Sequence, residues 1–243
     1  MATDAHTALT TDPLGPNVAA LAGYVFGTGS FTKATQVFND ITTKLNTGLS
    51  TDKTDPKQVI IYCDFSRLQT RENDERLWDP DTEQVVVVDQ DYKKCNSRTA
   101  IGGSPAAYST GNVDANTIQQ IQLCPWYIAS VSSSKTRLLK DFNLKGLASR
   151  IAAAGQKILG STTAMDDTCG FDCTMLHELS HTRDGGKTNF GDNPPDVYGW
   201  KAITAAPSQE MADSIAYFGL GVAQINAGNI PQADGSLQAA PAP

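Results

Sequence analysis

The chain has 243 residues, of which 40% are hydrophobic and 19% are charged, and it contains 20 glycines and 12 prolines. This is an ordinary globular composition, which excludes a disordered, collagenous or coiled-coil chain. The formal net charge of −7 argues against nucleic acid or an anionic membrane as the main partner, because both favour a basic surface. No apolar run approaches the roughly 20 residues of a membrane-spanning helix.

The N-terminus and the cysteines bear on the cellular compartment. The first residues contain neither a basic nor an apolar stretch, so they do not form a signal peptide. The chain is therefore either intracellular or a mature form with an added Met1. Five cysteines leave at least one unpaired within the chain, and disulfides are typical of oxidising compartments. We expect a mature, secreted monomer.

In chain order, helices are predicted first and strands follow. Residues 1–16 are polar and are expected to form an extension. Helix-like apolar spacing occurs over 18–26 and 31–49. Short β-branched runs predict buried strands at 59–63 and 85–88. A third strand is predicted at 118–127, where Pro125 would confine it to a sheet edge, and the charged segment 67–81 is expected to be a solvated loop.

The second half of the chain predicts helices, at 144–159, 172–182 and 208–225. Residues 227–243 are rich in alanine, proline and glycine and are expected to form a flexible tail. Strands in the first half and helices in the second indicate an α+β fold. We therefore expect one domain over 1–226, followed by the tail.

Residues 177–181 read His-Glu-Leu-Ser-His, which is the pattern H-E-x-x-H. On a helix, residues i and i+4 lie on one face, so His177 and His181 can both direct an imidazole nitrogen at one metal ion. Zn²⁺ accepts such nitrogens readily, and a catalytic zinc site keeps one position open for water. Glu178 would be the general base that activates this water. The chain has three histidines in all, so finding two of them here argues against a chance occurrence.

The third metal ligand is expected to be a carboxylate. No histidine follows His181, and His6 is expected to be an exposed residue near the N-terminus. A segment rich in glycine and proline, which can turn the chain back over the helix, contains three aspartates: Asp184, Asp192 and Asp196. Asp184 directly follows the predicted helix and is expected to be a polar turn residue. Asp192 and Asp196 are both far enough along the chain to return to the metal.

Together with this segment, the motif resembles the aspzincin metallopeptidases, the deuterolysin and peptidyl-Lys metalloendopeptidase group. Their motif continues as G-T-x-D-x-x-Y-G, in which the aspartate is the third zinc ligand and the tyrosine assists catalysis. Here residues 196–200 read Asp-Val-Tyr-Gly-Trp, a segment typical of fungal secreted proteins with a peptidase-type domain. Residues 211–218 are similar to the family's N-A-D-x-Y-x-x-F helix. The resemblance covers residues 169–220.

The resemblance implies a zincin-like fold, with a small twisted sheet in the first half above the active-site helix, and Zn²⁺ as the cofactor. The position of the family's ligand aspartate holds Pro195 here, so either Asp196 or Asp192 supplies the ligand. Asp196 is the first choice because it lies nearest to Tyr198. The resemblance implies that Tyr198 donates a hydrogen bond to the oxyanion. The alternative is that Tyr198 is a packed aromatic side chain with a solvated hydroxyl.

In a related group, the gluzincins, the third ligand is a glutamate on a later helix. Glu210 and Asp213 are three residues apart on the last predicted helix, so both can face inward. Under the aspzincin interpretation Asp213 orients a ligand histidine. Otherwise both acids lie on a solvated face near a helix N-terminus.

Cys169 and Cys173 lie just before and within the motif helix, four residues apart. That spacing is compatible with a second metal site. We expect instead that one or both cysteines form a disulfide to the strand half of the chain, through Cys124 or Cys63.

These observations predict a zinc-dependent endopeptidase that acts on a protein or peptide substrate. The substrate would pair with an edge strand of the sheet, and Glu178 would take the proton of a metal-activated water. One alternative is a secreted zinc-binding or antigen-like protein on the same scaffold. Another is a structural domain with a chance motif. The intact Glu178 argues against a pure binding protein, whereas the shifted aspartate argues slightly for one.

Overall fold

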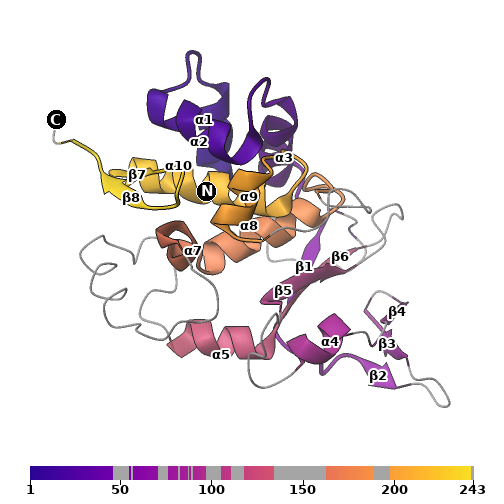
Figure 1. The fold of residues 1–243 in the computed structure, drawn as a ribbon. Helices are drawn as coiled ribbons and strands as arrows, with labels where there is room; N and C mark the ends of the chain where they lie inside the picture. The colour runs from indigo at the N-terminus through magenta and orange to yellow at the C-terminus, as the bar shows by residue number, and fades with distance from the viewer. Residues whose placement is uncertain are drawn as a thin grey trace.

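The structure is a computed structural model that describes residues 1–45, 55, 57–70, 76–81, 83–86, 88, 90–96, 105–110, 118–133, 163–188 and 198–241. Its architecture is mixed α+β, with small sheets in the N-terminal half and a helical C-terminal part, as expected (Figure 1). Among the described helices, none has the length and apolar character that a membrane span requires. The helix predicted over 144–159 lies outside the described residues.

The described helices are α1 (Ala2–Thr10), α2 (Pro16–Phe26), α3 (Thr32–Thr43), α4 (Gln90–Cys95), α5 (Pro125–Ser133), α7 (Ala164–Thr168), α8 (Phe171–His181), α9 (Trp200–Ala205) and α10 (Ala212–Asn226). The predicted helices that start near residues 18, 31, 172 and 208 correspond to α2, α3, α8 and α10. Two of these are shorter than expected, because α3 ends at Thr43 and α10 begins at Ala212.

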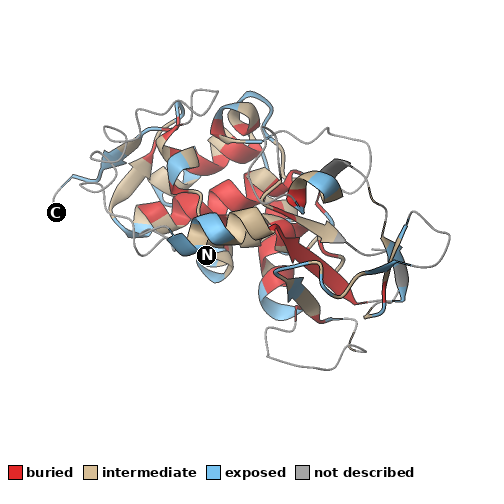
Figure 2. Ribbon diagram, turned by 90° about the horizontal axis from the view of Figure 1, so that it is seen from below, coloured by how far each residue is buried: buried red, intermediate tan, exposed pale blue. Residues whose placement is uncertain are grey.

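The main core surrounds α10, which packs against α1, α2 and α8 (Figures 1 and 2). Helix α10 is apolar over most of its circumference, as expected for a helix buried on several sides. Two glycines allow its neighbours to approach closely. A Cβ atom at Gly219 would lie 2.5 Å from the Leu176 side chain of α8, and one at Gly221 would lie 2.6 Å from Leu21 of α2. The helix that carries the motif is therefore seated directly on the core.

The sheet next to α8 has three strands in the order β1 (Val59–Tyr62), β6 (Gln119–Leu123) and β5 (Ala107–Thr110). Strand β1 is parallel to β6, and β5 is antiparallel to β6. The prediction that Pro125 would make this third strand an edge was wrong. The strand stops at Leu123 and lies in the centre with all five residues buried, and Pro125 starts α5, where a missing N–H costs nothing.

A second sheet has the order β2 (Gln69–Thr70), β3 (Leu77–Asp79) and β4 (Gln84–Val86). The expected solvated loop over 67–81 was therefore wrong for its described residues. Arg67 and the fully buried Asp79 form an ion pair of 2.9 Å there. The expectation of buried strands at 59–63 and 85–88 was also wrong, since Ile61 and Val85 are 44% and 43% exposed. The described residues of these runs form β1 and β4, but each strand lies in a small sheet with a solvated face.

Both ends of the chain are more ordered than their composition suggests. The expected N-terminal extension contains α1, which contacts α3 and α10 and buries Ala5 completely. The expected tail contains a hairpin of β7 (Asn229–Pro231) and β8 (Leu237–Ala239). The backbone of Gly235 accepts a hydrogen bond from Met165 N, and that of Ala233 accepts one from Trp200 Nε1. Tertiary contacts thus hold both the polar N-terminal segment and part of the segment expected to be a flexible tail.

The cysteine pairing also differs from the expectation. Disulfides join Cys95 to Cys124 and Cys169 to Cys173, and Cys63 is free and exposed. The expected link between the motif helix and the strand half was therefore wrong. The second bridge is local because the segment before α8 turns back, which brings the two Cα atoms to 5.1 Å. Disulfides are typical of proteins from oxidising compartments.

Candidate metal centre

Helix α8 carries the H-E-x-x-H motif between the helical core and the sheet. Leu176 contacts α10, while Met175 and Leu179 pack against a cluster of Ala107, Ile121 and Leu123 on β5 and β6. With these apolar side chains anchored on two sides, the histidines at i and i+4 share the remaining face. The local sequence therefore folds so that both imidazole rings point the same way.

The two imidazole rings of the motif meet through their Nε2 atoms. His177 Nε2 lies 3.1 Å from His181 Nε2. On the other side of the rings, His177 Nδ1 lies 2.6 Å from Asp213 Oδ1, and His181 Nδ1 lies 2.8 Å from the Thr188 carbonyl oxygen. Each Nδ1 therefore faces an acceptor oxygen. For His181 it is a carbonyl oxygen, and for His177 it is a carboxylate oxygen.

These partners assign the tautomer of both rings. A nitrogen that faces a carbonyl or carboxylate oxygen must carry the proton, so Nδ1–H is the donor in each ring. In the neutral ring Nε2 then carries a lone pair, and two such lone pairs facing each other at 3.1 Å repel unless a cation or a shared proton lies between them. Hydrogen bonding through Nδ1 is also how proteins orient histidines that bind metal through Nε2.

The distance between the two nitrogens suits a zinc ion. Two imidazole nitrogens bound to tetrahedral Zn²⁺ at about 2.0–2.1 Å lie roughly 3.4 Å apart, close to the 3.1 Å seen here. Within the described residues, no group of three His, Cys, Asp or Glu side chains is placed to hold a metal. Asp192 and Asp196, the expected third ligands, both lie outside the described residues. The described chain thus presents two nitrogen donors of the expected set.

Asp213, at the start of α10, holds two parts of the site together. Its Oδ1 accepts from His177 Nδ1, and its Oδ2 accepts from Gly199 N at 2.7 Å. This is the contact with a ligand histidine that the aspzincin resemblance implies. Glu210, the alternative from the gluzincin comparison, precedes α10; its side chain is 56% exposed and lies 3.7 Å from Lys33 Nζ. Its position on the surface does not support a ligand role.

The turn that follows α8 orients His181. Thr188 N donates to the Ser180 carbonyl, and the hydroxyls of Thr188 and Ser180 lie 2.7 Å apart. These bonds bring the Thr188 carbonyl back to His181 Nδ1. Asp184 lies in the same turn and pairs with Arg183 at 2.8 Å, in keeping with the expected polar turn residue. The sequence did not predict the role of Thr188, because the contact uses its backbone carbonyl, which every residue type has.

Glu178 lies beside the sheet and is 4% exposed. Its Oε2 is 2.8 Å from the hydroxyl of Ser109 on β5, and its backbone carbonyl is 2.9 Å from the same hydroxyl. A buried carboxylate needs hydrogen-bond donors, and Ser109 supplies one. The sequence contained no signal for this contact, since 69 residues separate the two positions.

Tyr198 lies next to the histidine pair but projects outward. Its ring stacks against His177 with centroids 5.9 Å apart, while the residue is 64% exposed. Tyr198 is therefore not a core residue, and an exposed ring stacked on His177 fits both the oxyanion donor and the packed aromatic with a solvated hydroxyl. The following Gly199 has φ of 86°, a conformation that favours glycine, and its N–H is bound by Asp213. The position of Tyr198 is thus tied to the residue that orients His177.

Asp166, on α7, holds the segment that follows Tyr198 and Gly199. Its Oδ1 accepts from Trp200 N at 2.8 Å and from the Tyr217 hydroxyl at 2.7 Å, and its Oδ2 accepts from Thr163 N. Burial opposes ionisation, but these hydrogen bonds outweigh it and lower the pKa of Asp166. Burial and the charge of Asp166 raise the pKa of Tyr217, so its hydroxyl stays protonated and remains a donor.

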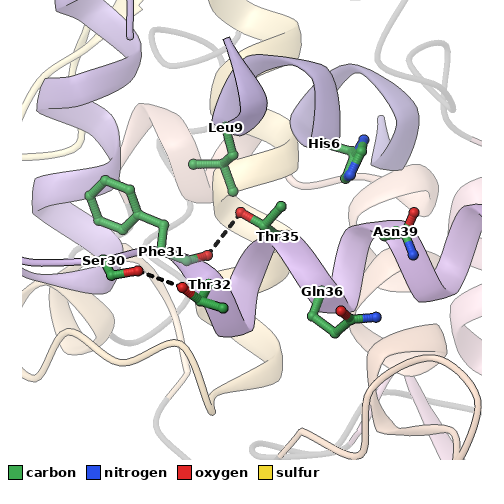
Figure 3. Close-up of a pocket in the computed structure, with 8 residues that line it drawn as sticks. All are labelled: His6, Leu9, Ser30, Phe31, Thr32, Thr35, Gln36 and Asn39. Atoms are coloured by element: carbon green, nitrogen blue, oxygen red, sulfur yellow. Dashed lines mark hydrogen bonds between the residues drawn. The ribbon is translucent and has the colours of Figure 1, made fainter. Parts of the chain in front are cut away.

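The third histidine takes no part in this arrangement. His6 lies on α1 and lines a pocket of about 390 Å³ between α1 and α3 (Figure 3). Leu9 and Phe31 contribute apolar surface there, and hydroxyl and amide side chains make up the rest. His6 is half-buried rather than exposed as expected, but none of the residues of the histidine pair or its partners lines this pocket.

No protein-family model matches this chain, and no curated protein or solved structure matches it either.

Proposed function

We propose that this protein is a secreted zinc-dependent endopeptidase of the aspzincin type, with a zincin-like arrangement of sheet and motif helix. The observation that carries the proposal is the facing pair of Nε2 atoms, 3.1 Å apart, with both Nδ1 atoms bound to oxygen acceptors. A chance H-E-x-x-H sequence has no need for two oriented histidines. The buried Glu178 next to the pair supplies the base that a pure zinc-binding protein does not require.

His177 and His181 would hold the metal through Nε2, and Asp196, or Asp192 as the second choice, would complete the ligand set. When bound, Zn²⁺ polarises the scissile carbonyl and lowers the pKa of a water molecule. Glu178 takes a proton from the attacking water and passes it to the leaving amine. Tyr198 donates a hydrogen bond to the oxyanion; its exposed ring beside His177 lies on the solvent side, where a peptide can reach it.

Strand β5 would bind the substrate backbone. It is an outer strand of the described sheet and contacts α8, so a peptide added to its open side would pass along the motif helix. Pairing of backbone groups gives affinity without a demand on side chains. This arrangement suits an endopeptidase, because an extended peptide can continue past the histidine pair in both directions.

The test is cleavage of an unfolded protein by the zinc-loaded enzyme and by Glu178→Ala, with bound zinc measured in both. Glu178→Ala is expected to lose activity by more than about 1,000-fold while it retains one equivalent of zinc. Glu210→Ala is the matched control, because it removes an exposed glutamate whose ion-pair partner is the surface residue Lys33 and is expected to keep full activity. A chelator is expected to abolish cleavage by the wild type.

Three results would contradict the proposal. If Glu178→Ala cleaves as fast as the wild type, the assigned mechanism is wrong. If the wild type binds zinc but cleaves nothing, the protein is a zinc-binding protein on this scaffold. Absence of stoichiometric zinc would instead indicate a chance motif.

A further inference from the structure

Ser109 occupies a position that joins the sheet edge to the general base. Strand β5 contacts α8, and Ala107 of β5 packs against Met175 and Leu179 of that helix. Side chains two residues apart in a strand point to the same face, so Ser109 also faces α8. There its hydroxyl lies 2.8 Å from Glu178 Oε2. The side chain of one strand residue thus reaches the carboxylate that would take the proton.

The backbone N–H and C=O groups of Ser109 lie in the plane of the sheet and point toward its outer side. Cys124 N, just after β6, donates to the carbonyl of Ala106, just before β5, so these two residues form a hydrogen-bonded pair in the register of the two strands. In an antiparallel pair, residues that bond to the neighbouring strand alternate with residues that do not. The register pairs Ala107 with Leu123 and Ser109 with Ile121. The backbone groups of Ala107 and Ser109 therefore point to the side of β5 away from β6.

We propose that Ser109 is a positioning residue that holds the Glu178 carboxylate through its hydroxyl while its backbone receives the substrate strand. This inference rests on the proposed endopeptidase function. The hydroxyl hydrogen bonds to Oε2, because a charged acceptor at 2.8 Å is preferred over a neutral carbonyl at 2.9 Å. With Oε2 engaged, Oε1 is the carboxylate oxygen that would take the proton of the water. Ser109 then both pairs with the substrate through its backbone and orients Glu178 through its hydroxyl.

A purely structural role is the competing explanation. Glu178 lies in the last turn of α8, where carbonyl groups lack partners within the helix, and Ser109 also lies within hydrogen-bond distance of the Glu178 carbonyl. If Ser109 only satisfied this carbonyl, its loss would lower the melting temperature without affecting the carboxylate. The experiment must therefore observe the carboxylate itself.

The experiment compares Ser109→Ala and Ser109→Thr in the full chain, with Ser133→Ala as the matched control on the exposed part of α5. The protein is labelled with ¹³C at the glutamate carboxyls, and the Glu178 resonance is assigned by its loss in Glu178→Gln. Ser109→Ala is expected to move this resonance at constant pH, whereas Ser109→Thr keeps a hydroxyl and is expected to leave it near the wild-type position. Ser133→Ala is expected to leave it unchanged.

Peptide cleavage gives the second readout. Ser109→Ala is expected to lower kcat by about 10-fold or more, with KM within about two-fold and bound zinc unchanged. Ser109→Thr is expected to restore most of kcat. The proposal is overturned if Ser109→Ala lowers only the melting temperature and leaves the Glu178 resonance and kcat at their wild-type values. If no form cleaves peptides, including the wild type, the endopeptidase proposal fails, and the resonance still decides whether Ser109 holds the carboxylate.

Discussion

At the residue scale, the candidate site depends on hydrogen bonds made behind the ligands. Asp213 and the Thr188 carbonyl each bind one Nδ1 atom, so the two Nε2 atoms are directed at one point before any metal arrives. Such preorganisation lowers the cost of ordering the side chains on binding. Metal affinity should therefore depend on the third ligand and also on the groups that orient the two histidines.

The choice of the third ligand can be tested by metal affinity. We expect Asp196→Ala to weaken zinc binding by more than about 100-fold, because losing a direct ligand costs more than losing a residue that orients one. Asp192→Ala is the matched change in the same segment and should alter affinity by less than about three-fold. Competition with a fluorescent zinc chelator measures both. Release of metal by the Asp192 change alone would mean that Asp192 is the ligand.

At the scale of elements, α8 and the turn after it act as one unit. The turn returns Thr188 to His181, and Gly185 lies at its closest approach to the helix. A Cβ atom at Gly185 would overlap both the Leu179 carbonyl oxygen and the Thr182 hydroxyl oxygen. The turn therefore requires glycine for space rather than for an unusual φ.

Gly185→Ala is expected to destabilise the protein by about 1 to 3 kcal/mol, because the turn must move to admit the methyl group. Zinc affinity should fall as well, since the same turn supports His181 through Thr188. Gly23→Ala is the control, because a Cβ atom there meets nothing within 4 Å. Alanine in place of glycine within a helix should raise the free energy of unfolding by about 0.5 to 1 kcal/mol. Urea unfolding and zinc competition measure the two effects. Equal stability of both variants would contradict the assignment of the turn.

At the scale of the whole molecule, Asp166 links three helices of the C-terminal half. It lies on α7, binds the first N–H of α9 through Trp200, and accepts from Tyr217 of α10. Because the pKa of Asp166 is lowered from its ordinary value of 3.8, its contribution to stability is fully present above that value. The contribution is lost as the pH falls through the lower pKa of the folded state.

Asp166→Asn is therefore expected to destabilise the protein by about 1 to 3 kcal/mol at pH 7, since an amide cannot accept all of these bonds. The difference from the wild type should shrink as the pH is lowered below 3.8. Urea unfolding at a series of pH values measures this difference. Asp4→Asn serves as the control, because that side chain is 56% exposed and should matter little at any pH. A difference that stays constant with pH would contradict the role assigned to Asp166.

The helices were predictable to the extent that their apolar spacing was uninterrupted. Helices α2, α8 and α10 lie close to their predicted positions because each has an apolar face that repeats with the helical period. The strand predictions located the segments but failed on burial, as Ile61 and Val85 show. A short β-branched run looks the same whether its sheet is covered on one face or on two. The ordered termini were missed because alanine-rich and polar segments are held by tertiary contacts, not by local propensity.

By itself, the sequence determined the pairing of His177 and His181 on one face of a helix, because the helical repeat alone brings residues i and i+4 together. It also placed Glu178 beside them and pointed to Asp213. Only the tertiary structure decided that Ser109, Thr188 and Asp166 support this site, and that Cys169 pairs with Cys173. Contacts between segments far apart in the chain depend on how α8 packs between α10 and the sheet, and no local periodicity carries that information.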